Sequence, residues 1–213
     1  MKKVVGIIGS CGKIGSSLAE KLLITGYKVI LVDINKRELL NLKKKLNSRN
    51  VEVFNTDIIK KKNIDNFIKF GEKKFQKIDA VVNCSYPKSK GWGTNFENIK
   101  ENFLKEDLFN QLGSTIILCQ RLTKYFLKVK GGNLILISSI MGVQSPKFEL
   151  YKNTKMTSPI EYSAIKSGII SITKYLSKYY KNKNIRINCI SAGGINDNQP
   201  ALFKKKYKNL CNS

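Results

Sequence analysis

The feature that most constrains the fold is a glycine-rich turn between a short apolar run and an amphipathic segment. The apolar run covers residues 4–9 (VVGIIG), the turn reads Gly9-Ser-Cys-Gly12-Lys-Ile-Gly15, and residues 13–25 have helical spacing. Glycines permit a tight turn and a close backbone approach to a ligand, while the helix N-terminus offers unpaired N–H groups to an anion. The order of strand, glycine turn and helix therefore predicts a nucleotide-binding unit at the start of the chain.

The same alternation of apolar runs and helical patterns continues along the chain. Further strands are predicted at 28–33, 51–55, 78–83, 133–138 and 185–190, and further helices at 37–46, 64–75, 96–129 (one or two helices) and 160–181. Apolar strands that alternate with helices are typical of a parallel sheet covered on both faces. We therefore expect an α/β fold, with one Rossmann-like doubly wound domain over residues 1–213.

The formal charge of +24 raises the question of a nucleic-acid partner. Only four of the 39 basic residues are arginine, the residue that nucleic-acid readers use for bidentate base contacts. We therefore expect no specific nucleic acid as a partner. No apolar run reaches 18 residues, so no membrane-spanning segment is expected.

The cysteines and histidines argue against a metal site. The five cysteines are scattered without a CxxC pair, and histidine is absent. Zinc sites need clustered Cys or His ligands, so no metal is expected. Four of the cysteines lie within predicted core elements or the glycine turn, as is typical of reduced cysteines that fill apolar space. This pattern predicts a cytoplasmic location.

Asp33 ends the second predicted strand, 18 residues past Gly15. A carboxylate at this point accepts hydrogen bonds from both ribose hydroxyls and repels a 2′-phosphate. It therefore favours NAD over NADP. The alternative is that Asp33 only caps the next helix.

A second group of polar residues follows the fifth strand. Tyr162-Ser-Ala-Ile-Lys166 places a phenol and an ammonium on one helix face. The lysine charge is expected to lower the pKa of the phenol from about 10, so that Tyr162 can exchange a proton with a substrate oxygen. Ser139 ends the fifth strand at the carboxyl edge, where ligands bind in such sheets, and its hydroxyl can hold the same oxygen.

A competing YxxxK pattern runs from Tyr151 to Lys155, 12 residues after Ser139. Tyr162 is the better candidate, because it begins a long amphipathic helix and rigid elements hold catalytic geometry better. Residues 145–160 are then interpreted as an insertion over the site, which shapes the choice of substrate. We refer to them as the 145–160 segment.

The order of these motifs resembles the short-chain dehydrogenase/reductase family along nearly the whole chain. The residues that carry the resemblance are GxxGxxG, Asp33, Asp57, VNCS (82–85), ISS (137–139), YSAIK (162–166) and RINCISAGGI (186–195). The resemblance implies that Ser139 steadies the substrate oxygen and that Tyr162 is the acid/base. It also implies that Lys166 tunes Tyr162 and holds the nicotinamide ribose.

The resemblance further implies a set of NAD contacts. Asp57 would contact the adenine, Asn83 would line the adenine–ribose side, and the Ile195 backbone would meet the carboxamide. The full implied set is Gly9, Cys11, Gly12, Lys13, Ile14, Gly15, Asp33, Asp57, Ile58, Asn83, Tyr162, Lys166, Gly193 and Ile195.

Two stretches are similar to a narrower subgroup, the flagellin modification protein A-like members. They are SPKFELYKNTKMTSPIEYSAIKSG (145–168) and GGINDNQP (193–200). This similarity implies a polar, sugar-like substrate in nonulosonic acid and surface glycan biosynthesis. The leading hypothesis is an NAD-dependent oxidoreductase that moves hydride to or from a hydroxyl or carbonyl of a sugar or sugar derivative.

Three features depart from the family pattern. Gln111 stands where the family has its active-site asparagine, and the neighbouring Asn110 would point about 100° away from that position. Ala192 replaces the usual proline before Gly193. No seventh strand precedes the end at Ser213, so we expect the sheet to lack its last strand and the chain to be poorly stable or self-associating. A homo-oligomer is expected with a complete C-terminus. The alternative function is a truncated or degenerate homologue that binds cofactor or partners without turnover.

Overall fold

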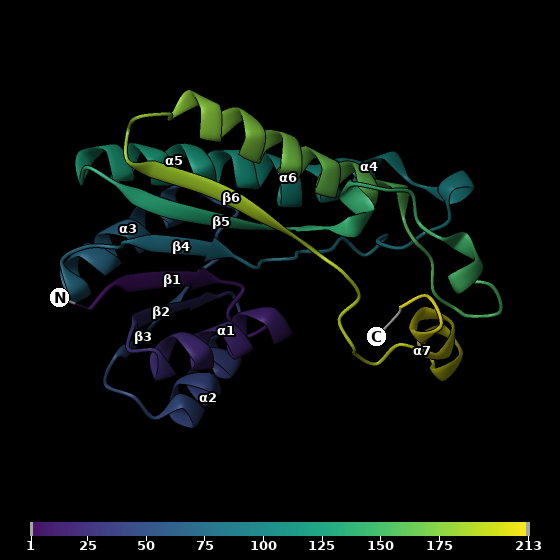
Figure 1. Cartoon of the computed structure of the whole chain (residues 1–213), viewed down its shortest axis with the longest axis horizontal. Coiled ribbons are helices and arrows are strands. Elements are labelled where there is room, and N and C mark those ends of the chain that lie inside the picture. The colour runs from purple at the N-terminus through teal and green to yellow at the C-terminus, as the bar shows by residue number, and fades with distance from the viewer. Residues whose placement is uncertain (1, 212–213) are drawn as a thin grey trace.

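The computed structural model describes residues 2–211 and shows one six-stranded sheet with helices on both faces (Figure 1). The strand order is β3-β2-β1-β4-β5-β6, and every neighbouring pair is parallel. The strands are β1 (Val4–Ile8), β2 (Lys28–Asp33), β3 (Val51–Asn55), β4 (Ala80–Asn83), β5 (Gly132–Ser139) and β6 (Ile185–Ala192). This order confirms the predicted doubly wound α/β fold, because the chain reverses direction across the sheet between β3 and β4.

Two buried apolar clusters hold the helices to the sheet. On one face, α1 (Lys13–Ile24) and α2 (Lys36–Leu46) pack through Ala19 and Leu39 onto β1 and β2. On the other face lie α3 (Lys61–Phe75), α5 (Ser114–Lys128) and α6 (Ile160–Tyr179), which bury Phe67, Phe126 and Ile165. The two faces thus share the same apolar strands, as the unbroken apolar runs in the sequence indicate.

Local hydrogen bonds explain where α2 begins and ends. The Asn35 side chain caps the helix by accepting from the Glu38 N–H at 3.2 Å. The helix ends at Asn47 in the left-handed conformation, with φ of 39°. Since Asn35 is the cap, the alternative that Asp33 serves only as a helix cap is wrong.

The segment predicted as one or two helices over 96–129 contains four elements. They are η1 (Phe96–Asn98), α4 (Glu101–Asp107), the π-helical turn η2 (Leu108–Gly113) and α5. The sequence did not predict η3 (Ile140–Gly142), η4 (Phe148–Leu150) or α7 (Ala201–Lys208). These short elements depend on tertiary contacts rather than on a long apolar period.

β6 lies at the edge of the sheet within the described residues. Ile187 is buried on the side that faces α6, whereas Asn188 and Ile190 point to the other side and are exposed. Because β6 pairs only with β5 among the described residues, the sheet matches the expectation that a seventh strand is missing. The expected low stability or self-association stays a prediction.

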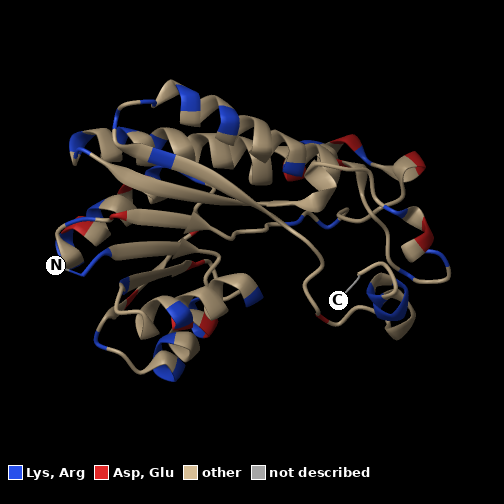
Figure 2. Cartoon of the chain, in the orientation of Figure 1, with Lys and Arg blue, Asp and Glu red and all other residues tan. Residues whose placement is uncertain are grey.

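The basic residues are spread over the helices on both faces of the sheet and over α7 (Figure 2). Among residues 2–211, no helix is long and apolar enough to cross a membrane. Within the same residues, no group of three or more His, Cys, Asp or Glu side chains could hold a metal ion.

Candidate active site

The glycine turn forms a cradle at the carboxyl end of β1. Gly9 has a positive φ of 71°, and its N–H donates to the Val32 carbonyl at 2.9 Å. A Cβ at Gly15 would lie only 2.7 Å from Ser10 Cα, so only glycine lets α1 pack this closely on the turn. Gly12 caps α1 without a side-chain hydrogen bond, which leaves the helix N–H groups open to an anionic group.

Asp33 stands beside this cradle with its carboxylate held by backbone N–H groups. Its Oδ2 accepts from the Cys11 N–H at 3.0 Å, and its Oδ1 accepts from the Asn35 N–H at 3.1 Å. Each oxygen keeps a further lone pair for a ligand. Asp33 lines a cavity of about 320 Å³ together with Gly9, Gly12, Asp57 and Ile58. The structure thus brings five of the predicted cofactor residues into one cavity whose donor and acceptor groups fit a ribose next to a phosphate.

Three other predicted cofactor residues do not line that cavity. Burial and the neighbouring Asp33 charge raise the pKa of Cys11 to about 12, so this thiol is neutral. Asn83 accepts from the Ser85 N–H at 3.2 Å and from its hydroxyl at 2.6 Å, so it shapes the turn after β4. Ile14 lies in the first turn of α1.

The residues after β6 lie apart from the Asp33 cavity. Gly194 donates its N–H to the Tyr207 hydroxyl at 2.8 Å, and Ile195 lines a separate cavity of about 540 Å³ beside α7. One ion pair joins the two regions, from Lys13 Nζ in the glycine turn to the Asp197 carboxylate at 2.5 Å. Cofactor contacts of Gly193 and Ile195 stay predictions.

Ser139, Tyr162 and Lys166 lie close together where β5 ends and α6 begins. Lys166 is only 6% exposed, and its Nζ donates to the Ile137 carbonyl at 2.9 Å. This burial lowers the pKa of Lys166 to about 8. The Ser139 hydroxyl accepts from the Met141 N–H at 3.2 Å and lies next to the Tyr162 phenol.

The pKa of Tyr162 differs from the expectation. Burial raises the pKa above its usual value of 10, and the contact with Ser139 only partly opposes this shift. The expected lowering by Lys166 is wrong for this structure, because the ammonium is bound to Ile137 and lies 5.5 Å from the phenol ring centroid. Tyr162 is therefore protonated at neutral pH and can donate its proton.

The two competing tyrosines have different surroundings. Tyr162 lies in the first turn of α6, with Lys166 one turn further along the same helix. Tyr151 follows the short turn η4, and its ring packs on Phe203 of α7 with centroids 5.4 Å apart. The helix gives Tyr162 the more rigid support, as the sequence predicted. The catalytic role of Tyr162 itself stays a prediction.

Two aromatic residues near Tyr162 were missed by the sequence analysis. The rings of Tyr86 and Trp92 lie with centroids 5.8 and 6.1 Å from that of Tyr162, edge to face. The Lys166 ammonium lies 5.3 Å from the Tyr86 ring centroid. The available signal was a tyrosine three residues after the fourth strand and the single tryptophan of the chain.

Gln111 is buried in the π-helical turn η2 and is 5% exposed. Neither its Nε2 nor its Oε1 has a hydrogen-bond partner among the described residues. Buried amides normally find partners, and π-helical turns are frequent at functional sites. Its place among the catalytic residues stays a prediction.

Comparisons with known proteins bear on the family and the fold of the chain. A family described as short chain dehydrogenase matches residues 3–206. The post-translational flagellin modification protein A of Campylobacter coli is 41% identical over 99% of this chain and 84% of its own. The 7alpha-hydroxysteroid dehydrogenase of Bacteroides fragilis is 26% identical over 91% of this chain and 71% of its own. A crystal structure of a short chain dehydrogenase from Leptospira borgpetersenii with bound NAD+ has a TM-score of 0.81 and 30% identity, covering 97% of this chain and 77% of that one.

Proposed function

Because the chain belongs to the short-chain dehydrogenase family, we propose that it moves hydride between NAD and a hydroxyl or carbonyl carbon of a sugar or sugar derivative. The coarser activity, that of an NAD(P)-dependent oxidoreductase, follows from the family. The observation that carries the proposal is the meeting of Ser139, Tyr162 and Lys166 at the same sheet edge as the glycine cradle.

The preference for NAD rests on Asp33. Its carboxylate faces the cavity with free lone pairs and would repel a phosphate on the ribose 2′-oxygen. The Leptospira relative binds NAD+, which agrees with this choice. Gly9, Gly12 and the open N-terminus of α1 would hold the pyrophosphate, and Asp33 the ribose.

The bound cofactor supplies or accepts hydride, and the residues of this chain handle the proton. The protonated Tyr162 can give its proton to a substrate oxygen during reduction and regain one during oxidation. Ser139 can hold the same oxygen by a hydrogen bond, since its hydroxyl lies beside the phenol. Lys166 has a pKa of about 8, so it provides positive charge near the tyrosine at neutral pH, and its ammonium is buried away from water.

The proposal of a sugar substrate rests on the similarity to one relative rather than on the fold. The Campylobacter relative, 41% identical, is named for the modification of flagellin. The 145–160 segment, which we interpreted as an insertion that shapes the choice of substrate, lies beside the catalytic residues.

The proposal is tested by comparing Tyr162→Phe with Tyr151→Phe. Removing the Tyr162 hydroxyl should lower kcat by about 10³-fold, within the usual range for general acid–base catalysis, while leaving NAD affinity nearly unchanged. Tyr151→Phe should change kcat only modestly. Steady-state kinetics and NADH fluorescence titration measure the two effects.

The reverse ranking of the two variants would show that Tyr151 is the acid/base. A wild-type protein that binds NADH but turns over no sugar, aldehyde or ketone would favour the binding-only alternative. Tighter binding of NADPH than of NADH would contradict the role of Asp33.

A further inference from the structure

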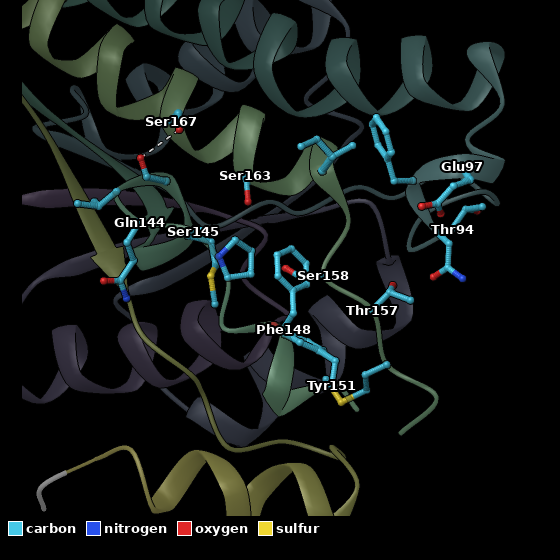
Figure 3. A pocket seen from close by; sticks show the side chains of 18 residues that line it. Thr94, Glu97, Gln144, Ser145, Phe148, Tyr151, Thr157, Ser158, Ser163 and Ser167 are labelled. Atoms are coloured by element: carbon cyan, nitrogen blue, oxygen red, sulfur yellow. Dashed lines mark hydrogen bonds between the residues drawn. The ribbon is translucent and has the colours of Figure 1, made fainter. Parts of the chain in front are cut away.

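A cavity lies between α6, the 145–160 segment and residues 94–97 (Figure 3). Its volume is about 800 Å³. Its wall includes neighbours of two proposed catalytic residues: Met141, whose N–H donates to Ser139, and Ser163, which follows Tyr162. The cavity therefore lies next to the proposed catalytic residues, which do not themselves line it.

Long-range contacts fix the walls of the cavity. The Thr157 hydroxyl donates to the Gly93 carbonyl at 2.6 Å, joining the 145–160 segment to the loop after β4. On the opposite side, Lys206 of α7 donates to the carbonyls of Glu149 and Lys152 at 3.0 and 2.8 Å. The cavity is therefore built by residues distant in sequence and is not a gap in a surface loop.

The lining mixes apolar and polar side chains and carries no positive charge. None of the described residues that line the cavity is lysine or arginine, although the chain has 39 of them. The polar groups are hydroxyls and amides, such as Ser158, Ser163 and Gln144, and the only carboxylate is the exposed Glu97. Figure 3 shows Ser163 pointing from α6 toward the aromatic ring of Phe148 and toward the 145–160 segment.

We propose that this cavity binds an uncharged, polyhydroxylated substrate unit and discriminates against units that carry a phosphate or a carboxylate. Hydroxyl and amide side chains exchange hydrogen bonds with a polyol, and Phe148 and Tyr151 offer apolar ring surface. A phosphate would lose its hydration here without gaining a cation, although the net charge of the protein attracts anions to the surface. This inference rests on the proposed function, which it deepens by naming the chemical class of the substrate.

The test uses the single tryptophan as a reporter of binding. Trp92 lies beside Tyr162, so a ligand at the catalytic end of the cavity should change its fluorescence. The probes are glucose and N-acetylglucosamine, each compared with its 6-phosphate, together with glucuronate, all at saturating NAD. The neutral sugars should bind at least about tenfold more tightly than their charged counterparts.

Two variants with the same change in net charge separate the effect of a charge inside the cavity from the effect of the net charge of the protein. Ser163→Lys places an ammonium in the cavity, whereas Ala164→Lys places it on the exposed surface of the same helix. Ser163→Lys should erase or reverse the preference for neutral sugars, and Ala164→Lys should keep it.

The inference is overturned if the wild type prefers the phosphates, if the neutral sugars produce no response, or if the two lysine variants shift the preference equally. The binding assay needs no turnover, so it is repeated with Tyr162→Phe. A neutral preference that survives in this variant supports the cavity assignment even where the kinetic test of the proposed function fails.

Discussion

The nucleotide half and the substrate half of the sheet edge are built in different ways. Around β1 and β2, backbone N–H groups and glycines form the site, and the Asp33 carboxylate is held by the N–H groups of Cys11 and Asn35. Around β5 and α6, side chains converge from the loop after β4, the 145–160 segment and α7. The first half depends on local backbone geometry, and the second depends on contacts across the whole fold.

This difference explains how each half can be changed. A glycine that a neighbouring backbone atom touches cannot be substituted without moving that backbone, so a single methyl group should have a large effect on stability. A loop joined by single hydrogen bonds can be loosened in small steps. The following predictions test that contrast, from the largest expected effect to the smallest.

The largest effect should come from the buried Lys166, on the substrate side. Its native pKa of about 8 lies below its ordinary value of 10.5, so the unfolded chain binds more protons between these pH values. The free energy of unfolding contributed by Lys166 should therefore rise as the pH increases from 8 to 10.5, by on the order of 3 kcal/mol. Urea denaturation of the wild type and of Lys166→Met across this range measures the difference.

In Lys166→Met this rise should be missing, while the opposing titration of buried thiols such as Cys119 remains in both proteins. Parallel stability curves for the two proteins would show that Lys166 titrates normally in the native state.

On the nucleotide side, Gly15 and Gly12 should respond differently to alanine. At Gly15 a Cβ meets the backbone of the turn, so Gly15→Ala should lower the free energy of unfolding by about 1–3 kcal/mol and weaken NAD binding. Gly12 has φ of −71° and its nearest Cβ contact would be 3.4 Å away, so Gly12→Ala should keep or raise stability.

Gly12→Ala should still weaken NAD binding, because the new methyl group lies where the pyrophosphate approaches the helix. Thermal melts and NADH titrations of both variants separate the two effects. Equal stability losses would contradict the difference in packing between the two glycines.

The cofactor preference should depend on the charge of Asp33. Asp33→Asn keeps an oxygen that can accept from a backbone N–H but removes the charge that repels a 2′-phosphate. The ratio of NADPH to NADH dissociation constants should fall by about tenfold, equivalent to about 1.4 kcal/mol. An unchanged ratio would show that other residues of the cavity discriminate between NADH and NADPH.

The smallest effect should come from the hydrogen bond between Thr157 and Gly93. Thr157→Val removes a net contribution of about 1 kcal/mol that joins the 145–160 segment to the loop after β4. KM for the substrate should rise by about fivefold while NAD affinity is unchanged. Thr25→Val, at the exposed end of α1, is the matched control and should leave both constants as in the wild type.

The sequence predicted the α/β layout because each strand carries its own apolar run and each main helix its own period. The bounds of β2 and β3 match the predicted runs, and α1 and α6 begin at the predicted residues. The sequence also placed Gly9, Asp33 and Ser139 at the carboxyl edge of the sheet, since each directly follows or ends a strand.

Tertiary structure decided the rest, because it depends on burial and on contacts between distant residues. The lowered pKa of Lys166 and the raised pKa of Tyr162 both come from burial, which no local pattern reveals. The same holds for the ring of Trp92 beside Tyr162 and for α7, whose Lys206 binds carbonyls more than 50 positions away. Sequence determined the strands, the glycine cradle and the candidate catalytic residues, whereas only packing determined the protonation of those residues and the cavity without basic side chains beside them.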